Sequence, residues 1–171
     1  MNEKAKAVRM MVFDVDGVLT DGGLHYTDSG EEIKTFNTLD GLGMKLLKDS
    51  GVKLAIITGR SSRIVEHRAR QLGVDYVYQG VHDKFETFRK LLAETGLGTG
   101  QCAYMGDDLV DLPVMRRVAF AVAVPDSPEL VRSHADYVTR LSGGRGAVRE
   151  ACEVIMQAQG TLEAALAPYL A

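Results

Sequence analysis

The chain has 171 residues, 46% of them hydrophobic and 25% charged, which predicts one α/β domain spanning residues 1–171. The formal net charge of −3 argues against a nucleic acid or an anionic membrane as partner. No stretch approaches the roughly 20 apolar residues of a membrane span, and the first residues lack the apolar run of a signal peptide, so we expect a cytoplasmic protein. Cys102 and Cys152 lie far apart among apolar neighbours, which favours buried thiols over a disulfide.

The first half of the chain alternates short apolar runs with helical patterns. Residues 8–15 form an apolar run that ends in acid, as a buried strand does. Residues 23–36 alternate apolar and polar side chains around Asp28-Ser29-Gly30, which predicts a β-hairpin. The following elements are expected in order: a helix over 42–48, a strand over 53–58, a helix over 61–72 and a strand over 76–78.

The second half continues the alternation. Helices are expected over 84–94, 114–117, near Glu129 and over 147–157, and strands over 102–105, 119–122 and 137–138. Residues 160–171 form a short helix or a tail. This order predicts a doubly wound, mostly parallel sheet with helices on both faces. Ligands of such sheets bind beyond the carboxyl ends of the strands, so the residues at these ends are the candidates for function.

Two acids follow the first predicted strand. Alternate side chains of a strand point to the same face, so Asp14 and Asp16 lie side by side if the extended geometry continues. Neighbouring carboxylates repel each other, and desolvation strengthens the repulsion. A divalent cation relieves it, and oxygen ligands of this kind suit Mg²⁺.

Polar residues also follow the other predicted strands. Thr58 ends the second strand, and Lys84 opens the helix after the third. The fourth strand ends in three acids, namely Asp107, Asp108 and Asp111. Each of these residues has an ordinary explanation alone, as a cap or a surface charge. Together they suit phosphoryl transfer, which needs a nucleophile in line, cations on the phosphoryl oxygens and donors that fix the group.

These residues give the chain its resemblance to a known family. The segment 14–22, Thr58, Lys84 and the segment 106–111 resemble, in the correct order, the four motifs of the haloacid dehalogenase superfamily. The resemblance implies a phosphatase in which Asp14 is the nucleophile and Asp16 the general acid–base. It further implies that Mg²⁺ is held by Asp14, the main-chain carbonyl of Asp16, and Asp107. Thr58 and Lys84 then bind the phosphoryl oxygens, supported by Asp108 and Asp111.

The spacing of the motifs leaves no room for the cap domain that many members carry. There are 41 residues between Asp16 and Thr58, and 25 between Thr58 and Lys84. An uncapped site is open to water, so another part of the assembly must enclose the substrate. The hairpin of a neighbouring subunit is the candidate.

Uncapped members that hydrolyse 3-deoxy-D-manno-octulosonate 8-phosphate in lipopolysaccharide biosynthesis are homotetramers, and this chain resembles them in several segments. The segments are 36–41, 58–60, 79–80, 135–140 and 143–150. The resemblance implies that the following residues contact the sugar acid phosphate, besides Asp16 and Lys84: Asn37, Thr38, Leu39, Asp40, Gly41, Lys45, Arg60 and Arg68. The basic members of this set suit the carboxylate and the phosphate of such a substrate.

Two features of the resemblance leave alternatives open. Many members carry a basic residue where this chain has Leu39, so a related nine-carbon sugar acid phosphate is the alternative substrate. The segment 143–146 is either a hinge before the last helix or an anion-binding loop whose Arg145 reaches a neighbour's site.

Two other classes of protein share some of these features. A receiver domain also gathers acids, Thr and Lys on an α/β sheet, but its acid pair precedes the phosphoacceptor in sequence. An oligomerisation module without turnover does not require the full set of acids, hydroxyl and ammonium found here. The order of the residues favours a phosphatase over a receiver domain, and the presence of all the proposed catalytic side chains gives no support to a module without turnover.

Overall fold

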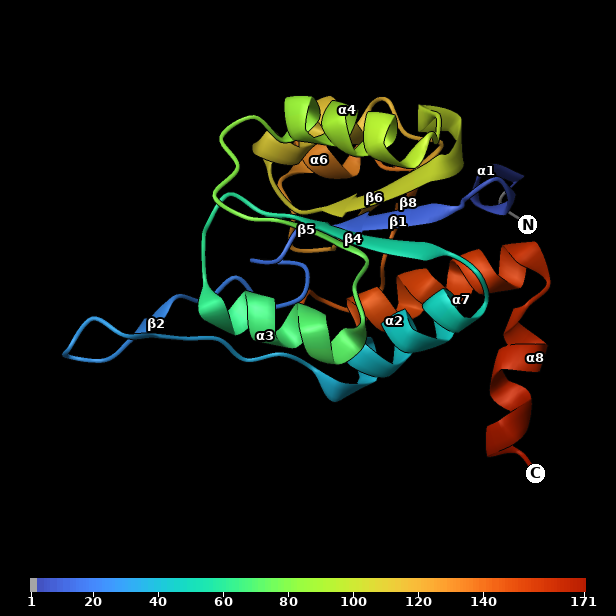
Figure 1. Cartoon of the computed structure of the whole chain (residues 1–171), viewed down its shortest axis with the longest axis horizontal. Coiled ribbons are helices and arrows are strands. Elements are labelled where there is room, and N and C mark those ends of the chain that lie inside the picture. The colour runs from blue at the N-terminus through green and yellow to red at the C-terminus, as the bar shows by residue number, and fades with distance from the viewer. Residues whose placement is uncertain (1–2) are drawn as a thin grey trace.

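The computed structural model describes residues 3–171 and consists of a six-stranded parallel sheet between two layers of helices (Figure 1). The strand order is β5-β4-β1-β6-β7-β8, and every pairing is parallel. The strands are β1 (Met10–Phe13), β4 (Lys53–Ile57), β5 (Tyr76–Tyr78), β6 (Cys102–Gly106), β7 (Phe120–Ala123) and β8 (Tyr137–Val138). The predicted doubly wound fold is therefore confirmed.

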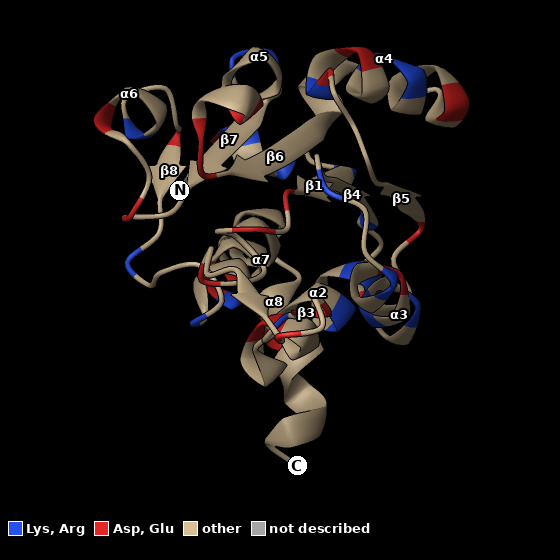
Figure 2. Ribbon diagram, turned by 90° about the vertical axis from the view of Figure 1, so that its left-hand side faces the viewer, with Lys and Arg blue, Asp and Glu red and all other residues tan. Residues whose placement is uncertain are grey.

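The two helical layers cover opposite faces of the sheet (Figures 1 and 2). One layer contains α2 (Thr38–Asp49), α3 (Arg63–Leu72) and α7 (Ala147–Gln159), and the other contains α4 (Lys84–Thr95), α5 (Leu112–Met115) and α6 (Glu129–Arg132). Alternate side chains of β1 enter the two cores, Met11 and Phe13 on one face and Met10 and Val12 on the other. The remaining helical segments are α1 (Glu3–Lys6), η1 (Thr99–Gln101), η2 (Leu109–Asp111), α8 (Leu162–Leu166) and η3 (Ala167–Tyr169).

Helix α2 begins earlier than the expected residue 42. Asn37 caps its first turn, with its side-chain oxygen accepting a hydrogen bond from the N–H of Leu39 at 2.8 Å. Gly41 and Gly43, which weaken the helical pattern in the sequence, are packing positions. A Cβ at Gly43 would lie 2.8 Å from the Cα of Arg149, so the missing side chain lets α7 pack closely against α2.

The predicted hairpin is present and extends away from the sheet (Figure 1). Its strands β2 (His25–Tyr26) and β3 (Glu32–Ile33) pair antiparallel, and Leu24, Tyr26 and Ile33 are about half exposed. Apart from the hairpin and α2, no element of residues 3–171 lies between β1 and β4, and the segment from β4 to Lys84 contains only α3 and β5. The described chain thus has no cap domain.

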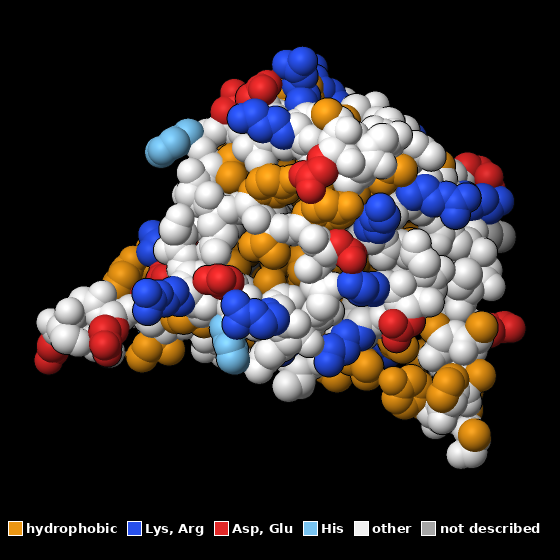
Figure 3. Space-filling view, viewed as in Figure 1, with side chains coloured by type: hydrophobic (Ala, Val, Ile, Leu, Met, Phe, Trp, Pro, Cys, Tyr) orange, Lys and Arg blue, Asp and Glu red, His pale blue; other side chains and the backbone are white. Residues whose placement is uncertain are grey.

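The end of the chain is helical. Helix α8 contacts α7, and η3 continues from α8 at the lower right of Figure 3, where hydrophobic side chains gather. Tyr169 in η3 is 62% exposed. Cys102 and Cys152 are both free and buried, as predicted. Among residues 3–171, no helix combines the length and apolar character needed to cross a bilayer.

Candidate active site

The carboxyl ends of β1, β4 and β6 meet at one edge of the sheet. Because β1 pairs with both β4 and β6, the residues that follow these strands lie next to one another: Asp14, Thr58 and Asp107. They line a pocket of about 250 Å³. Its full lining is Asp14, Asp16, Gly22, Thr58, Gly59, Arg60, Lys84, Asp107, Asp108 and Val110.

Lys84 connects two buried acids at the floor of this pocket. Its Nζ lies 2.7 Å from Oδ2 of Asp14 and 2.6 Å from Oδ1 of Asp111. Burial alone would lower the pKa of Lys84, but the charges of Asp111 and Asp14 outweigh burial and raise it. The first turn of α4 also disfavours a cation, so the two carboxylates are what keep this ammonium in place.

Asp111 is fully buried, and both of its oxygens are used within the protein. Oδ1 accepts hydrogen bonds from Lys84 and from the hydroxyl of Tyr104 at 2.7 Å. Oδ2 accepts the backbone N–H groups of Asp107 and Asp108 at 3.0 and 3.2 Å. Asp111 therefore holds both the cation and the loop that carries Asp107, as a support rather than a ligand. The carboxylate of the neighbouring Asp108 turns outward and caps η2.

The pocket holds more negative than positive charge. Burial and the charge of Asp111 raise the pKa of Asp14 to about 6, against the opposing effect of Lys84. Burial and the charges of Asp14 and Asp111 raise the pKa of Asp107 to about 7. Three carboxylates therefore share one ammonium, and the ionised cluster is disfavoured unless a further cation binds.

The donor set fits a hard divalent cation. Carboxylate oxygens of Asp14, Asp107 and Asp111 all lie within 4.8 Å of one another. Because the oxygens of Asp111 already accept four hydrogen bonds, Asp14 and Asp107 are the available ligands of this group. The backbone after Asp16 runs close to them, since a Cβ at Gly17 would lie 2.0 Å from Oδ2 of Asp107. Oxygen ligands alone suit Mg²⁺.

Asp16 faces the pocket from the side of the hairpin. Its Oδ1 lies 2.5 Å from Nζ of Lys34, and its Oδ2 lies 3.7 Å from Nε of Arg60. The sequence pattern did not single out Lys34 or its neighbour Glu32. Both belong to the hairpin segment, whose alternation predicted a strand pair and gave no sign that its charged side chains reach Asp16.

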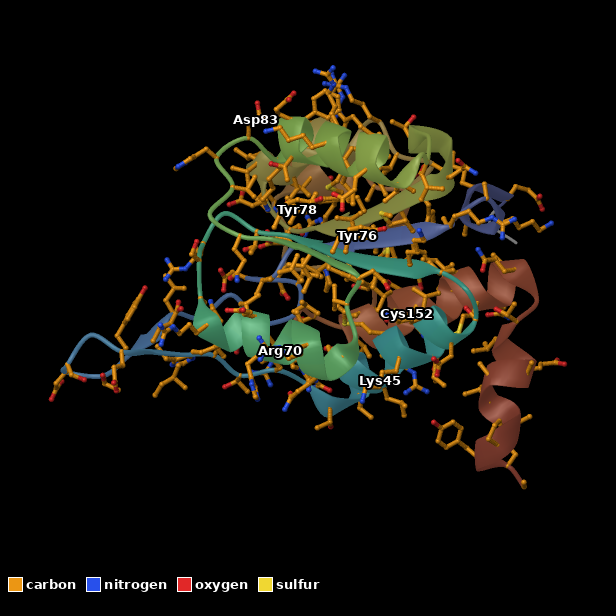
Figure 4. All side chains as sticks on the ribbon, in the orientation of Figure 1. Lys45, Arg70, Tyr76, Tyr78, Asp83 and Cys152 are labelled. Atoms are coloured by element: carbon orange, nitrogen blue, oxygen red, sulfur yellow. The ribbon has the colours of Figure 1, made fainter. Side chains whose placement is uncertain are left out.

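Most of the expected substrate contacts lie outside this pocket. Of that set only Asp16, Arg60 and Lys84 line it. Asn37, Asp40, Gly41 and Arg68 line a separate small cavity between α2 and α3. Arg68 donates a hydrogen bond to the carbonyl of Asn37 at 3.2 Å. Lys45 is exposed on α2, in the helical layer opposite Asp83, the residue before Lys84 (Figure 4).

Asp40 has a structural partner on α7. It is 2% exposed, and its oxygens accept the backbone N–H groups of Arg149 at 2.9 Å and Gly146 at 3.3 Å. Its carboxylate thus caps the start of α7 and does not face the pocket. Leu39, by contrast, is 58% exposed.

The glycine-rich segment 143–146 packs against the loop that follows Asp16. A Cβ at Gly143 would lie 1.9 Å from the carbonyl oxygen of Gly17, and one at Gly144 would lie 2.6 Å from the backbone nitrogen of Asp21. The N–H of Gly144 also donates to the carbonyl of Val18 at 3.0 Å. Arg145 lies 3.5 Å from the carboxylate of Asp21. The segment therefore supports the acidic loop of its own chain.

Comparison with known proteins gives concordant matches. Residues 30–119 match the profile of a family described as haloacid dehalogenase-like hydrolase. The chain is 46% identical, over 95% of its length and 86% of the relative's, to 3-deoxy-D-manno-octulosonate 8-phosphate phosphatase KdsC of Escherichia coli K12.

Two crystal structures are similar over nearly the whole chain. One is a probable YrbI family phosphatase from Pseudomonas syringae pv. phaseolica, with a TM-score of 0.98 and 56% identity over 99% of this chain and 96% of that one. The other is 3-deoxy-D-manno-octulosonate 8-phosphate phosphatase from Moraxella catarrhalis, in complex with a magnesium ion, a phosphate ion and a KDO molecule. Its TM-score is 0.96, with 45% identity over 98% of this chain and 97% of that one.

Proposed function

The chain belongs to the haloacid dehalogenase-like hydrolases, and from this premise we propose that it is a magnesium-dependent phosphatase for 3-deoxy-D-manno-octulosonate 8-phosphate. The products are the free sugar acid and phosphate, in lipopolysaccharide biosynthesis in the cytoplasm. The observation that carries the proposal is the pairing of a buried Asp14 with Lys84 at the floor of an acidic pocket. The near full-length relatives named for this activity supply the substrate.

In the proposed reaction, Asp14 attacks phosphorus and forms an aspartyl-phosphate. Its Oδ1 accepts the N–H of Val15 at 2.7 Å and its Oδ2 is bonded to Lys84, so the carboxylate is fixed before the substrate arrives. Lys84 and Thr58 donate to the phosphoryl oxygens. Asp16 protonates the leaving oxygen and then takes a proton from the water that hydrolyses the intermediate.

We further propose that Asp14, Asp107 and the main-chain carbonyl of Asp16 hold the magnesium ion. The excess negative charge of the pocket and the raised pKa values of Asp14 and Asp107 support this assignment. When bound, the ion neutralises these carboxylates and the charge on the phosphoryl oxygens.

A panel of phosphorylated sugar acids tests the substrate assignment. We expect kcat/KM for 3-deoxy-D-manno-octulosonate 8-phosphate to exceed that for nine-carbon sugar acid 9-phosphates by at least about ten-fold, since matched polar contacts discriminate strongly between substrates. The measurement is phosphate release at saturating magnesium. Equal values across the panel contradict the assignment, and a preference for a nine-carbon acid favours the alternative raised by Leu39.

The open pocket leads us to propose a homotetramer in which the hairpin of one subunit covers the site of another. The half-exposed Leu24, Tyr26 and Ile33 on the hairpin support this proposal, because contact with another copy would bury them. The exposed Thr38, Leu39 and Lys45 and the half-buried Arg68 lie away from the pocket of their own chain, and we propose that they meet the substrate from this neighbouring position. Asp40 and Gly41 are buried and stay structural.

Light scattering coupled to an activity assay checks this arrangement. We expect a mass of four chains, and we expect an apolar-to-charged substitution such as Ile33→Asp to lower both the mass and the turnover of the sugar acid phosphate. Leu170→Asp is the matched control, because Leu170 is exposed at the far end of the chain. A monomeric wild-type protein with full activity contradicts the proposal.

A further inference from the structure

Lys34 is a buried ammonium beside the proposed general acid–base. It lies between β3 and α2, its side chain is 2% exposed, and its Nζ is 2.5 Å from Asp16 and 3.3 Å from Glu32. Removing an ammonium from water costs several kcal/mol unless carboxylates surround it. The two acids therefore hold the ammonium of Lys34 in place, and the ammonium in turn holds their carboxylates.

Arg60 lies beside the same two acids, so Lys34, Asp16, Arg60 and Glu32 form a ring of alternating charges. It lies 2.7 Å from Glu32 and 3.7 Å from Asp16, so each acid of the ring has two cationic neighbours. Burial alone would raise the pKa of Glu32, but its hydrogen bonds with Arg60 and Lys34 outweigh burial and lower it. The same guanidinium donates to the hydroxyl of Tyr26 at 2.7 Å. Both strands of the hairpin are thus tied to the Asp16 carboxylate.

We propose that Lys34 is a positioning residue that fixes the carboxylate of Asp16 for proton transfer to the leaving oxygen. The hairpin then belongs to the catalytic apparatus of its own chain, in addition to any contact with a neighbour. The inference rests on the proposed phosphatase function and on the role of Asp16 within it. Its physical basis is that misplacing a reacting group by about 1 Å costs on the order of 10²-fold in rate.

The proposal predicts a dependence on the leaving group. A nitrophenolate departs readily without a proton, whereas an alkoxide needs one from Asp16. Loss of Lys34 should therefore slow alkyl phosphates and spare 4-nitrophenyl phosphate. The useful parameter is kcat/KM, because it reports the steps up to phosphoryl transfer, in which the leaving oxygen departs.

The experiment compares wild type, Lys34→Met and Lys34→Arg on three substrates at saturating magnesium. These are 4-nitrophenyl phosphate, ethyl phosphate and 3-deoxy-D-manno-octulosonate 8-phosphate. For Lys34→Met we expect kcat/KM to fall about 10–100-fold on both alkyl phosphates and less than about three-fold on the nitrophenyl ester. Lys34→Arg should recover part of the loss. Ratios between substrates do not depend on the fraction of folded enzyme.

Two controls separate positioning from other effects. Lys48→Met removes an ion pair with Asp75 at 2.8 Å and should leave all three values unchanged, because neither residue lines the pocket. Asp16→Asn alone should lower kcat/KM in the same order of substrates as Lys34→Met, with larger losses. Adding Lys34→Met to Asp16→Asn should then lower kcat/KM no further.

Three results overturn the proposal. An equal loss on all three substrates indicates a general structural effect. A loss confined to the sugar acid phosphate shows that Lys34 binds its carboxylate. An additive effect of Lys34→Met in the Asp16→Asn background shows that Lys34 does not act through Asp16. If the wild-type protein hydrolyses none of the three, the phosphatase function itself is refuted, a result distinct from a wrong role for Lys34.

Discussion

Asp14→Asn is expected to lower phosphatase turnover by at least about 10³-fold, because the amide cannot form the covalent intermediate. The fold of the pocket should survive, since Asn has nearly the same shape and Lys84 keeps its bond to Asp111. Phosphate release measured over hours with excess magnesium gives the residual rate. Turnover at the wild-type level refutes the mechanism.

The same substitution should make the metal-free protein more stable at pH 8. The pKa of Asp14 is raised to about 6 in the folded state, so the ionised carboxylate disfavours folding above that pH. Asn removes this penalty, and we expect a gain in unfolding free energy of the order of 1 kcal/mol in EDTA. The gain should vanish near pH 4, where Asp14 is protonated in the folded state.

Chemical denaturation with and without magnesium measures this effect. Magnesium should stabilise the wild type much more than Asp14→Asn, which lacks one of the proposed ligands. Asp49→Asn, at an exposed position near the end of α2, is the matched control and should behave as wild type. A variant that is less stable than wild type in EDTA at pH 8 would contradict the charge balance described for the pocket.

Lys84→Met should lower turnover by about 10²–10³-fold or more, because it removes a fixed cation from the phosphoryl oxygens. Unlike Asp14→Asn, it should also destabilise the protein, by about 3–5 kcal/mol, since two buried carboxylates lose their partner. Without the lysine, which opposes the effect of burial, the pKa of Asp14 rises further above its value of about 6. The destabilisation should therefore be larger at pH 8 than at pH 5, where protonation relieves the repulsion.

Urea unfolding at the two pH values, combined with activity at saturating magnesium, measures both effects. Lys90→Met is the matched control on the same helix, because Lys90 is exposed. A full loss of activity without any change in stability would show that Lys84 contributes little to holding the acids. A loss of stability with normal activity would exclude it from phosphoryl binding.

The strands and their terminal acids were predictable because both signals are local. A buried parallel strand is a short apolar run, and Asp14, Thr58 and Asp107 directly follow such runs. The predicted strand 76–78 agrees with the structure for the same reason. Parallel pairing puts these strand ends at one edge of the sheet. The strand order β4-β1-β6, which the structure adds, makes the three residues neighbours.

The contacts that depend on packing between distant segments were not predictable. Gly41 and Gly43 weaken the helical pattern, so the sequence does not show that α2 begins before them. The structure explains both glycines, because neighbouring helices pack closely against them. Asp40 reads as a polar residue of a binding segment, yet it caps α7 over a hundred residues later. Nothing in the sequence around Lys34 distinguishes it from a solvated surface lysine. Only the fold of the hairpin shows that its side chain is buried against Asp16.

The contact of Gly143 and Gly144 with the loop after Asp16 bears on where this enzyme can be shortened. All the acids, the hydroxyl and the ammonium assigned to the reaction occur before residue 112. A fragment ending there would contain every one of these groups and would still lack the backbone against which the acidic loop rests. The smallest functional unit must therefore include this late glycine pair, and it extends well past the last reactive side chain.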